Sequence, residues 1–415
     1  MLDTELYRHL LGIESPWKVT KVVLSVREQK VDVWVAHPRG VEWPCPECGV
    51  PCHAYDHADE RSWRHLDSCQ FLTFLHARPP RLECGTHGVR QARLPWAEEH
   101  SRFTALFEKL AIMVLLETSV KGAAAILRIS WDEAWTIVEK AVERGLARKG
   151  NHGPERIGVD EKAMARGQSY CTIVCDLDRG NVEHVEEKRT QESFESYLRS
   201  LGSDGLARIK VFAMDMWPPY IAAVRATVPQ ADEKIVFDRY HIASHMGKAV
   251  DKVRSREHRE LREMGDETLT GSKYLWLWNL ENVPEDDRAR FRRLRAADLK
   301  TARAWAIKEN LRLFWNYLTV RGAERFWQRW YFWATHSRLT PVIKVAKMIK
   351  RHLPNVLTYF RHHVTNATAE GLNSLIETVR KRAAGFRSKK HFKTAIYFHC
   401  GGLNLYPTQL PHGNV

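Results

Sequence analysis

The sequence lacks an apolar run long enough to cross a membrane. Its longest apolar stretches, such as residues 110–116, fall far short of the roughly 20 residues that a spanning helix needs. Residues 1–15 also lack the charged segment followed by a sustained apolar one that marks a secretory signal. We therefore expect a cytoplasmic protein with no membrane partner, in which thiols stay reduced.

Cysteine is scarce as well, with eight residues among 415, and its distribution is uneven. The motif Cys45-Pro-Glu-Cys48-Gly is repeated in spacing by Cys84-Gly-Thr-His87-Gly. Two such knuckles supply the four ligands that a tetrahedral zinc ion needs. In a reducing compartment this pattern favours bound zinc over a disulfide. The sequence thus predicts structural zinc held by Cys45, Cys48, Cys84 and His87. The neighbouring Cys52 and His53 leave the ligand set open.

Acidic residues are outnumbered by basic ones, 50 against 64, so the net charge is +14. A strongly basic chain points to a polyanionic partner, and double-stranded DNA is the first candidate. No motif for a serine or tyrosine nucleophile stands out, which disfavours a covalent protein intermediate. The length allows roughly three domains.

Residues 103–148 have helical periodicity. We expect one amphipathic helix over 103–117, a second over 119–127, and a third that opens at Ser130 with a capping box. This pattern is typical of a helix-turn-helix, whose last helix enters the major groove of DNA. Arg128, Trp131 and Lys140 are then the candidate DNA contacts. An ordinary three-helix packing unit has the same periodicity and remains the alternative.

An α/β pattern follows after residue 155. A strand ends at Asp160, two further strands over 170–176 and 182–187 form a meander with it, a helix covers 190–201, and a later strand ends at Asp215. One acid alone would favour a strand that simply ends in solvent. The pair, delivered to one edge of one sheet, favours a site for Mg²⁺ or Mn²⁺, because these ions prefer oxygen ligands.

A third acid must come from elsewhere in the chain. Residues 365–377 begin with capping residues and continue as a helix on which Glu370, Asn373, Ser374 and Glu377 share a face. Glu370 is our choice and Glu377 the rival. We expect the helix to run on into a basic segment that would hold the DNA backbone. Its candidate contacts are Arg380, Lys381, Arg382, Arg387, Lys389 and Lys390.

Four of these segments resemble the bacterial insertion-sequence transposases of the ISL3 family, members of the DDE class. They are IGVDE (157–161), VFAMDMWPPY (211–220), VFDRYH (236–241) and the stretch 365–388. The resemblance implies Asp160, Asp215 and Glu370 as the catalytic acids, a bacterial, nucleoid-associated protein, and a homodimer or larger synaptic complex. In that family the second knuckle is commonly formed by cysteines, so His87 is a departure.

The expected fold class is multidomain α/β, with a ribonuclease H-like catalytic domain preceded by a zinc module and a helix-turn-helix. We expect a helical insertion because the 155 positions between Asp215 and Glu370 exceed what the remaining elements of the sheet domain require. Most of its tryptophans should lie in the core, although one or two are candidates for stacking on an unpaired base. The predicted segments are 1–40 (α/β lead-in), 41–100 (zinc), 101–150 (helix-turn-helix), 151–245 (catalytic), 246–363 (insertion) and 364–415 (final catalytic helix and basic segment).

The function expected from these features is DNA transposition. The enzyme would bind the terminal inverted repeats of an insertion sequence, cut a strand with the help of the metal, and transfer the freed end to target DNA. Two alternatives remain at this stage: a structure-specific nuclease without strand transfer, and a DNA-binding regulator that has lost activity.

Overall fold

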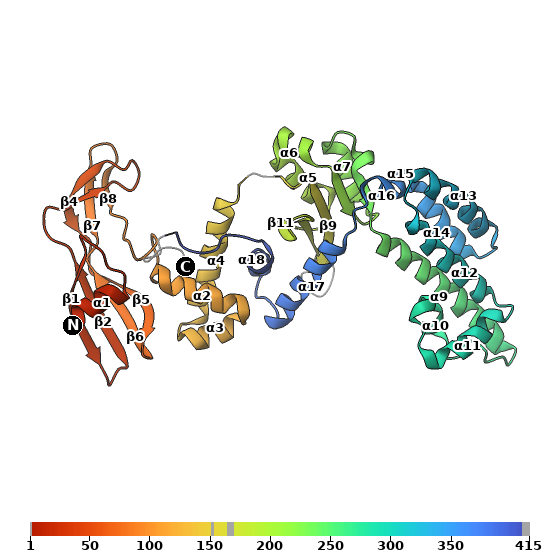
Figure 1. Ribbon diagram of the computed structural model, residues 1–415, viewed down its shortest axis with the longest axis horizontal. Coiled ribbons are helices and arrows are strands. Elements are labelled where there is room, and N and C mark those ends of the chain that lie inside the picture. The colour runs from red at the N-terminus through yellow and green to blue at the C-terminus, as the bar shows by residue number, and fades with distance from the viewer. Residues whose placement is uncertain (1, 151–152, 164–169, 409–415) are drawn as a thin grey trace. The chain divides into compact units, whose positions relative to one another are not determined.

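The structure is a computed structural model that describes residues 2–150, 153–163 and 170–408. Its helices and strands divide into two compact units, one formed by residues 1–150 and 379–415 and the other by residues 151–378 (Figure 1). None of the helices among the described residues is both long enough and apolar enough to span a bilayer.

The first unit begins with a helix and two four-stranded sheets. Alternating burial along β2 and β6 places one face of the first sheet in a core with the indole of Trp63. Trp17 joins the two parts of this core, since its ring packs against Trp43 and Trp96 at centroid distances of 5.3 and 4.8 Å. The elements are α1 (Asp3–Leu10), the sheet β1 (Lys18–Ser25), β2 (Lys30–Ala36), β6 (Phe71–Ala77) and β5 (Arg61–Ser68), and the sheet β3 (Glu42–Pro44), β4 (Pro51–His57), β7 (Pro80–Cys84) and β8 (Gly88–Gln91).

Three helices follow in the same unit: α2 (Ala105–Glu117), α3 (Val120–Leu127) and α4 (Trp131–Arg148). Each begins after a hydroxyl residue that caps it, and the capping box predicted at Ser130 is present, with Glu133 completing it. Arg128 ends α3 in the left-handed conformation and so forms the tight turn before α4. The three expected helices are confirmed.

The carboxyl-terminal basic segment differs from the expectation. The helix α17 (Ala367–Arg382) ends at Arg382 rather than running through the basic residues, because Ala384 and Gly385 have positive φ angles. A separate helix, α18 (Lys389–Cys400), starts after the cap Ser388 and packs on α4. Residues 379–415 consequently belong to the unit that holds the helix-turn-helix, and the predicted segment 364–415 is divided between the two units.

A five-stranded sheet organises the second unit. Its order is β11-β10-β9-β12-β13, with β11, β10 and β9 antiparallel and β9, β12 and β13 parallel. The meander and the later strands that the sequence predicts are therefore confirmed. The strands are β9 (Arg156–Ala163), β10 (Tyr170–Asp176), β11 (Asn181–Glu187), β12 (Val211–Met214) and β13 (Ile235–Phe237).

Short helices pack on this sheet through large buried side chains. Phe194 of α5 contacts Phe212 of β12 and Tyr220 of α7, with centroid distances of 6.2 and 5.8 Å. All three side chains are buried, so they hold α5 and α7 against the sheet. The helices are α5 (Gln191–Ser200), α6 (Gly202–Arg208), α7 (Pro218–Thr227) and α8 (Ala231–Lys234).

The predicted helical insertion is confirmed, although it begins at Arg239 rather than near residue 246. Trp276, Trp305, Trp327 and Trp330 are buried in its core, as expected for most of its tryptophans, whereas Trp333 is 42% exposed. The helices are α9 (Arg239–Glu263), α10 (Lys273–Leu277), α11 (Glu285–Ala296), α12 (Lys300–Arg312), α13 (Val320–His336), α14 (Thr340–Arg351), α15 (Leu353–Leu357) and α16 (Tyr359–His362), with the short 3₁₀ helices η1 (Leu280–Asn282) and η2 (Leu313–Asn316).

Candidate active site and zinc centre

Asp160 and Asp215 lie side by side at one edge of the five-stranded sheet. The register pairs Met214 with Val159 in parallel strands, so the next residue on each strand is one of the two acids. Backbone amides fix both carboxylates, since Glu161 N–H donates to Asp160 Oδ1 (2.7 Å) and Met216 N–H donates to Asp215 Oδ1 (2.6 Å). The strand order confirms that the two acids lie on neighbouring strands of one sheet. The prediction that the first strand ends at Asp160 is wrong, because β9 continues to Ala163 and stays paired with β10 as far as Tyr170.

His241 stands beside Asp215. Its Nδ1 lies 3.2 Å from Asp215 Oδ2, and its Nε2 lies 3.9 Å from Asp238 Oδ2. Asp238 in turn caps α9, because its side chain accepts a hydrogen bond from Tyr240 N–H (2.9 Å). The segment DRYH therefore places an imidazole against a candidate catalytic acid.

Groups around Asp160 shift the pKa of its carboxyl in opposite directions. Burial raises the pKa of this carboxyl above its ordinary value, while the backbone N–H of Glu161, the charge of His241 and the amide of Asn373 oppose that rise. The groups that oppose it are the ones that favour a carboxylate. They favour the anionic form, which binds cations, but burial has the larger effect and the pKa of Asp160 stays above its ordinary value.

The helix α17 docks directly on the strand that carries Asp160. Asn373 donates from its side-chain amide to Asp160 Oδ2, and Lys162 Nζ donates to the carbonyl of Asn373 (3.2 Å). One turn earlier, Ala369 sits over Gly158, where an added Cβ would lie 3.2 Å from the Ala369 Cβ. The sequence places Asn373 on the helical face of Glu370, three positions further on, but does not identify it as a site residue.

Glu370 and Glu377 have different environments on that helix. Lys162 Nζ lies 3.4 Å from Glu377 Oε2, so the rival acid is held in an ion pair. Glu370 is exposed, and within the described part of the chain its carboxylate has no hydrogen-bond or ion-pair partner. Among the described residues, the one group of three or more possible metal ligands within 4.8 Å of one another is a different set, described below. The three acids are therefore near each other in the fold without closing to that distance.

A cleft of about 960 Å³ opens beside these acids, inside the second unit. Glu370 and Asp238 line it on one side, together with Asn366 at the start of α17. Helices of the insertion line the other side with Arg295, Trp305, Trp315 and Trp333. Of the three candidate acids, Glu370 thus borders a space that is walled by aromatic and cationic side chains.

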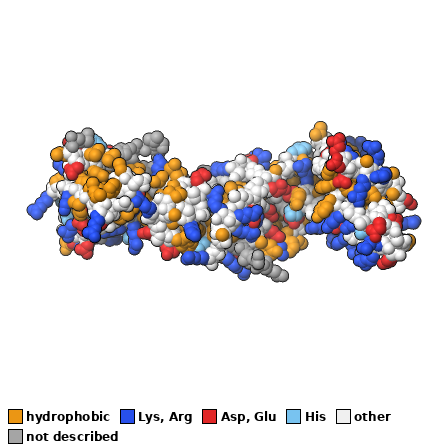
Figure 2. Space-filling view, turned by 90° about the horizontal axis from the view of Figure 1, so that it is seen from below, with side chains coloured by type: hydrophobic (Ala, Val, Ile, Leu, Met, Phe, Trp, Pro, Cys, Tyr) orange, Lys and Arg blue, Asp and Glu red, His pale blue; other side chains and the backbone are white. Residues whose placement is uncertain are grey.

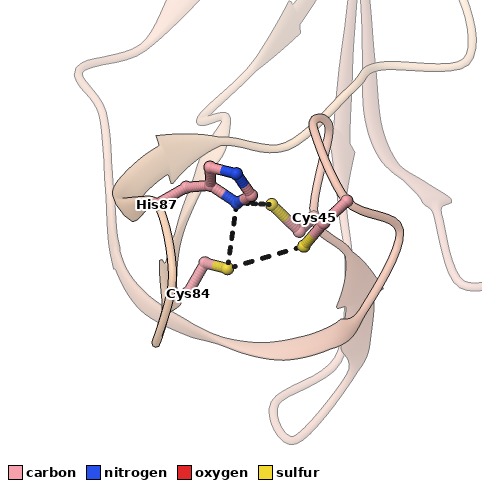
Figure 3. Close-up of side chains that lie close together, drawn as sticks. Cys45, Cys84 and His87 are labelled. Atoms are coloured by element: carbon pink, nitrogen blue, oxygen red, sulfur yellow. Dashed lines mark hydrogen bonds between the residues drawn. The ribbon is translucent and has the colours of Figure 1, made fainter.

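The second candidate site is in the first unit, where Cys45, Cys84 and His87 point toward one another (Figure 3). Cys45 Sγ and Cys84 Sγ lie 3.8 and 3.6 Å from His87 Nδ1, and Cys48 Sγ lies 3.7 Å from Cys84 Sγ. The four ligand atoms all lie within 4.8 Å of one another. Three thiols and an imidazole at these distances fit tetrahedral zinc.

The structure also distinguishes these four residues from the nearby Cys52 and His53. Cys52 points its thiol to the carbonyl of Val50 (3.3 Å), and His53 lies 3.4 Å from Glu42 on the surface. Neither belongs to the group of four. Backbone N–H groups of His87 and Thr86 lower the pKa of Cys84 to about 7, so the knuckle itself favours the thiolate that zinc requires.

The predicted DNA contacts of the helix-turn-helix make contacts within their own unit. Arg128 forms an ion pair with Asp67, and Lys140 Nζ donates to the carbonyl of His100 (3.1 Å). Trp131 is half-buried, stacks on Trp135 at 5.8 Å, and lies under the guanidinium of Arg387 at 4.2 Å. These contacts leave the DNA-binding assignment of the three residues as a prediction.

The basic residues of the carboxyl-terminal segment are mostly at the surface. Lys381, Arg382, Arg387, Lys389 and Lys390 are exposed and Arg380 is half-buried. Lys390 Nζ lies 3.3 Å from Glu139, and Arg382 donates to the carbonyl of Leu116 (3.0 Å). Lys and Arg side chains are also spread over the face of the helical region seen at the right of Figure 2. The chain therefore offers positive surface in both units.

Comparison with known proteins covers the whole of this architecture. Residues 157–396 match a family model described as a transposase, residues 92–142 match the helix-turn-helix domain of transposase family ISL3, and residues 42–87 match the zinc finger of the transposases of IS204, IS1001, IS1096 and IS1165. The chain is 27% identical to the transposase for insertion sequence element IS1001 of Bordetella parapertussis, over 84% of this chain and 86% of that protein. It is 26% identical to the transposase for insertion sequence element IS1557 of Mycobacterium tuberculosis, over 94% of this chain and 93% of that protein.

Proposed function

Because the chain belongs to the ISL3 family of transposases, we propose that it cuts and joins DNA through the acids Asp160, Asp215 and Glu370. One observation carries this proposal above the others. Asp160 within β9 and Asp215 just after β12 lie on adjacent parallel strands, and the helix that bears Glu370 docks on β9 through Asn373. This arrangement supports a site shared by three acids from distant parts of the chain.

The sheet supports a ribonuclease H-like fold for this domain. Its first three strands form an antiparallel meander, the fourth and fifth strands are parallel to the first, and helices connect them. A helical insertion then separates the last strand from the final helix. This is the arrangement expected of a DDE-type catalytic domain.

The carboxylates at the sheet edge fit a hard divalent cation, because their donor atoms are oxygens and the backbone already fixes two of them. Asp160, Asp215 and Glu370 would hold Mg²⁺ or Mn²⁺ there. Such an ion supplies Lewis acidity for phosphoryl transfer on DNA. The proposal requires the exposed carboxylate of Glu370 to approach the other two acids when DNA binds.

The residues around the acids have separable tasks in the proposed reaction. Asn373 orients Asp160, and His241 orients Asp215. Water would attack a phosphodiester at the element's end, breaking the bond to the 3′ oxygen and leaving a 3′-hydroxyl. That hydroxyl would then attack a phosphodiester of target DNA, form the new bond and release another 3′-hydroxyl.

DNA recognition is assigned to the first unit. The zinc module and the helix-turn-helix would bind the terminal inverted repeats, and the basic residues between Arg380 and Lys390 would hold the backbone by charge. Joining requires two ends in one assembly. We therefore propose that the active form is a homodimer or a larger synaptic complex.

The deciding experiment is incubation of the whole chain with DNA that carries the element's ends, in Mg²⁺ buffer. Wild type is expected to nick the ends and join them to target DNA, whereas D160A is expected to bind the same DNA and do neither. Full cleavage by D160A would overturn the assignment of the site. Cleavage without joined product would identify a nuclease instead of a transposase, and binding without cleavage by wild type would identify a regulator.

A further inference from the structure

The cleft that Glu370 borders is lined by aromatic side chains, one of which is exposed to solvent. Trp333 of α13 is 42% exposed at its wall, although a large indole gains most by burial. Trp315 stands half-buried in the same wall and Trp305 is buried behind it, so Trp333 offers the aromatic surface that is open to a ligand. Flat aromatic surface next to a phosphoryl-transfer site suits a nucleobase, because every base has a face that stacks on an aromatic ring.

Two cations in the cleft wall are available to a ligand. The guanidinium of Arg295 lies 4.6 Å above the ring of Trp305, and that of Arg239 lies 5.2 Å from the ring of Tyr359. Neither has a carboxylate partner within the part of the chain that the structure describes. Arg312, by contrast, is paired with Glu281 and Glu309. Arg239 and Arg295 therefore offer positive charge to a phosphate.

A buried polar atom gives an independent indication of a ligand. Asn366 lines the cleft and is only 4% exposed, and its Oδ1 has no hydrogen-bond partner among the described residues. An unsatisfied buried acceptor costs free energy, so such groups usually have a partner that binds there. The amino group of a base, or a sugar hydroxyl, is a donor of the right kind.

We propose that this cleft binds one unpaired nucleotide at the cut end of a DNA strand. Its base stacks on Trp333, its phosphate lies against Arg239 and Arg295, and Asn366 accepts a hydrogen bond from it. The volume of about 960 Å³ is at the upper end of the range for small-ligand pockets and accommodates a nucleotide. The proposal rests on the proposed function, since Glu370 borders the same cleft and would bring the bound end toward the site of the proposed catalytic acids.

The test measures binding in buffer without Mg²⁺, so that cleavage plays no part. The probes are a duplex with a two-nucleotide single-stranded 3′ extension that contains 2-aminopurine and the matching blunt duplex. We expect W333A to bind the extended duplex about 5- to 100-fold more weakly than wild type, as loss of one base stack implies, and the blunt duplex equally. W333F should restore most of the loss, and the 2-aminopurine should be quenched by wild type and not by W333A.

Phe332 provides the matched control. It neighbours Trp333 on α13 and is 64% exposed, yet it does not line the cleft. F332A should bind both duplexes as wild type does. R295A is the second variant. For binding to the extended duplex, it should lower the steepness of the plot of log association constant against log salt concentration by about 0.7. Equal behaviour of W333A and F332A, or an unchanged slope in R295A, would overturn the proposal.

Failure of the cleft and failure of the proposed function give different results. A chain that cuts and joins DNA in Mg²⁺ but has no Trp333-dependent preference for the extension would refute the cleft alone. A chain that binds the extension through Trp333 but releases no cut strand in Mg²⁺ would refute the proposed cleavage.

Discussion

At the scale of single residues, Glu370 and Glu377 of α17 differ in the groups that their carboxylates contact. Both lie on one helical face, but Glu377 is paired with Lys162, whereas Glu370 borders the cleft. An acid already engaged by a lysine inside its own unit is less available to a metal ion. Sequence spacing alone leaves the choice between them open, and the ion pair favours Glu370.

We expect E370Q to reduce cleavage by at least about 100-fold, because a metal-binding carboxylate would be lost. E377Q should change cleavage by no more than about fivefold, since a partly exposed ion pair contributes up to about 1 kcal/mol. Gel assays of strand nicking in Mg²⁺ would measure both, and filter binding would show that both variants still hold DNA. The reverse ranking would transfer the role to Glu377.

A buried histidine in the first unit predicts a pH dependence of stability. Burial, assisted by the charge of Arg64, lowers the pKa of His65 to about 4 from its ordinary 6.5, and its Nδ1 shares a hydrogen bond of 2.9 Å with the hydroxyl of Thr104. Because the unfolded chain binds this proton more readily, the stabilisation is complete above pH 6.5. It decreases as the pH falls toward 4.

Between pH 7 and pH 4.5 wild type should therefore lose roughly 2–3 kcal/mol more than H65Q, which has no titrating ring. Urea denaturation of both chains at the two pH values, followed by tryptophan fluorescence, measures this difference. Other titrating groups contribute equally to both proteins and cancel. Parallel losses in the two proteins would show that His65 does not supply the effect.

At the scale of elements, the packing of α17 on β9 depends on the absence of a side chain at Gly158. A Cβ there would lie 2.6 Å from Cys175 Sγ and 2.8 Å from Leu177 Cδ2, as well as against Ala369. G158A should therefore destabilise the chain by about 1–3 kcal/mol and lower cleavage by displacing Asn373 from Asp160. Thermal denaturation and nicking assays measure the two effects.

Gly371 supplies the control on the same helix. Nothing lies within 4 Å of the position that its Cβ would occupy, so G371A is expected to be neutral or to stabilise the helix by up to about 1 kcal/mol. If G158A is as stable and as active as G371A, then α17 does not need close contact with β9.

Local signals in the sequence predict much of this packing. Alternating apolar residues, turn residues and the caps at Ser119, Ser130 and Thr190 identify the strands and helices. The acids that follow two apolar stretches identify Asp160 and Asp215, although β9 continues past Asp160 to Ala163. The contact of Asn373 with Asp160 spans 213 positions and has no local signature. The end of α17 also escaped prediction, because the segment after Arg382 is rich in helix-forming residues and only the backbone at Ala384 and Gly385 stops it.

The zinc knuckles form an element whose folding should depend on metal. C84S should lose the zinc ion that these four residues hold and with it the binding of the element's ends, because the ion would join the Cys45–Cys48 knuckle to the Cys84–His87 knuckle. C52S, whose buried thiol is outside the set of four, should keep one zinc ion per chain. Metal analysis and DNA binding measure both. Zinc loss in C52S would place that thiol among the ligands.

At the scale of the whole molecule, the proposed joining of two ends requires chains to act together. Each chain has one set of Asp160, Asp215 and Glu370, and each chain would bind one end. If the active assembly is a dimer with both sets in use, one inactive partner prevents paired joining even when the other partner is intact. Mixing wild type with D160A therefore reports on the assembly without disturbing DNA binding.

In an equimolar mixture allowed to exchange before DNA is added, about one quarter of random dimers contain two wild-type chains. Joining of paired ends should accordingly fall to about one quarter of the wild-type rate at the same total concentration, and further in a larger assembly, while independent chains would give about one half. Counting doubly joined products by gel electrophoresis measures this ratio. A value of one half would refute the obligatory synaptic dimer while leaving the site at the sheet edge intact, because single-end nicking needs only one set of acids.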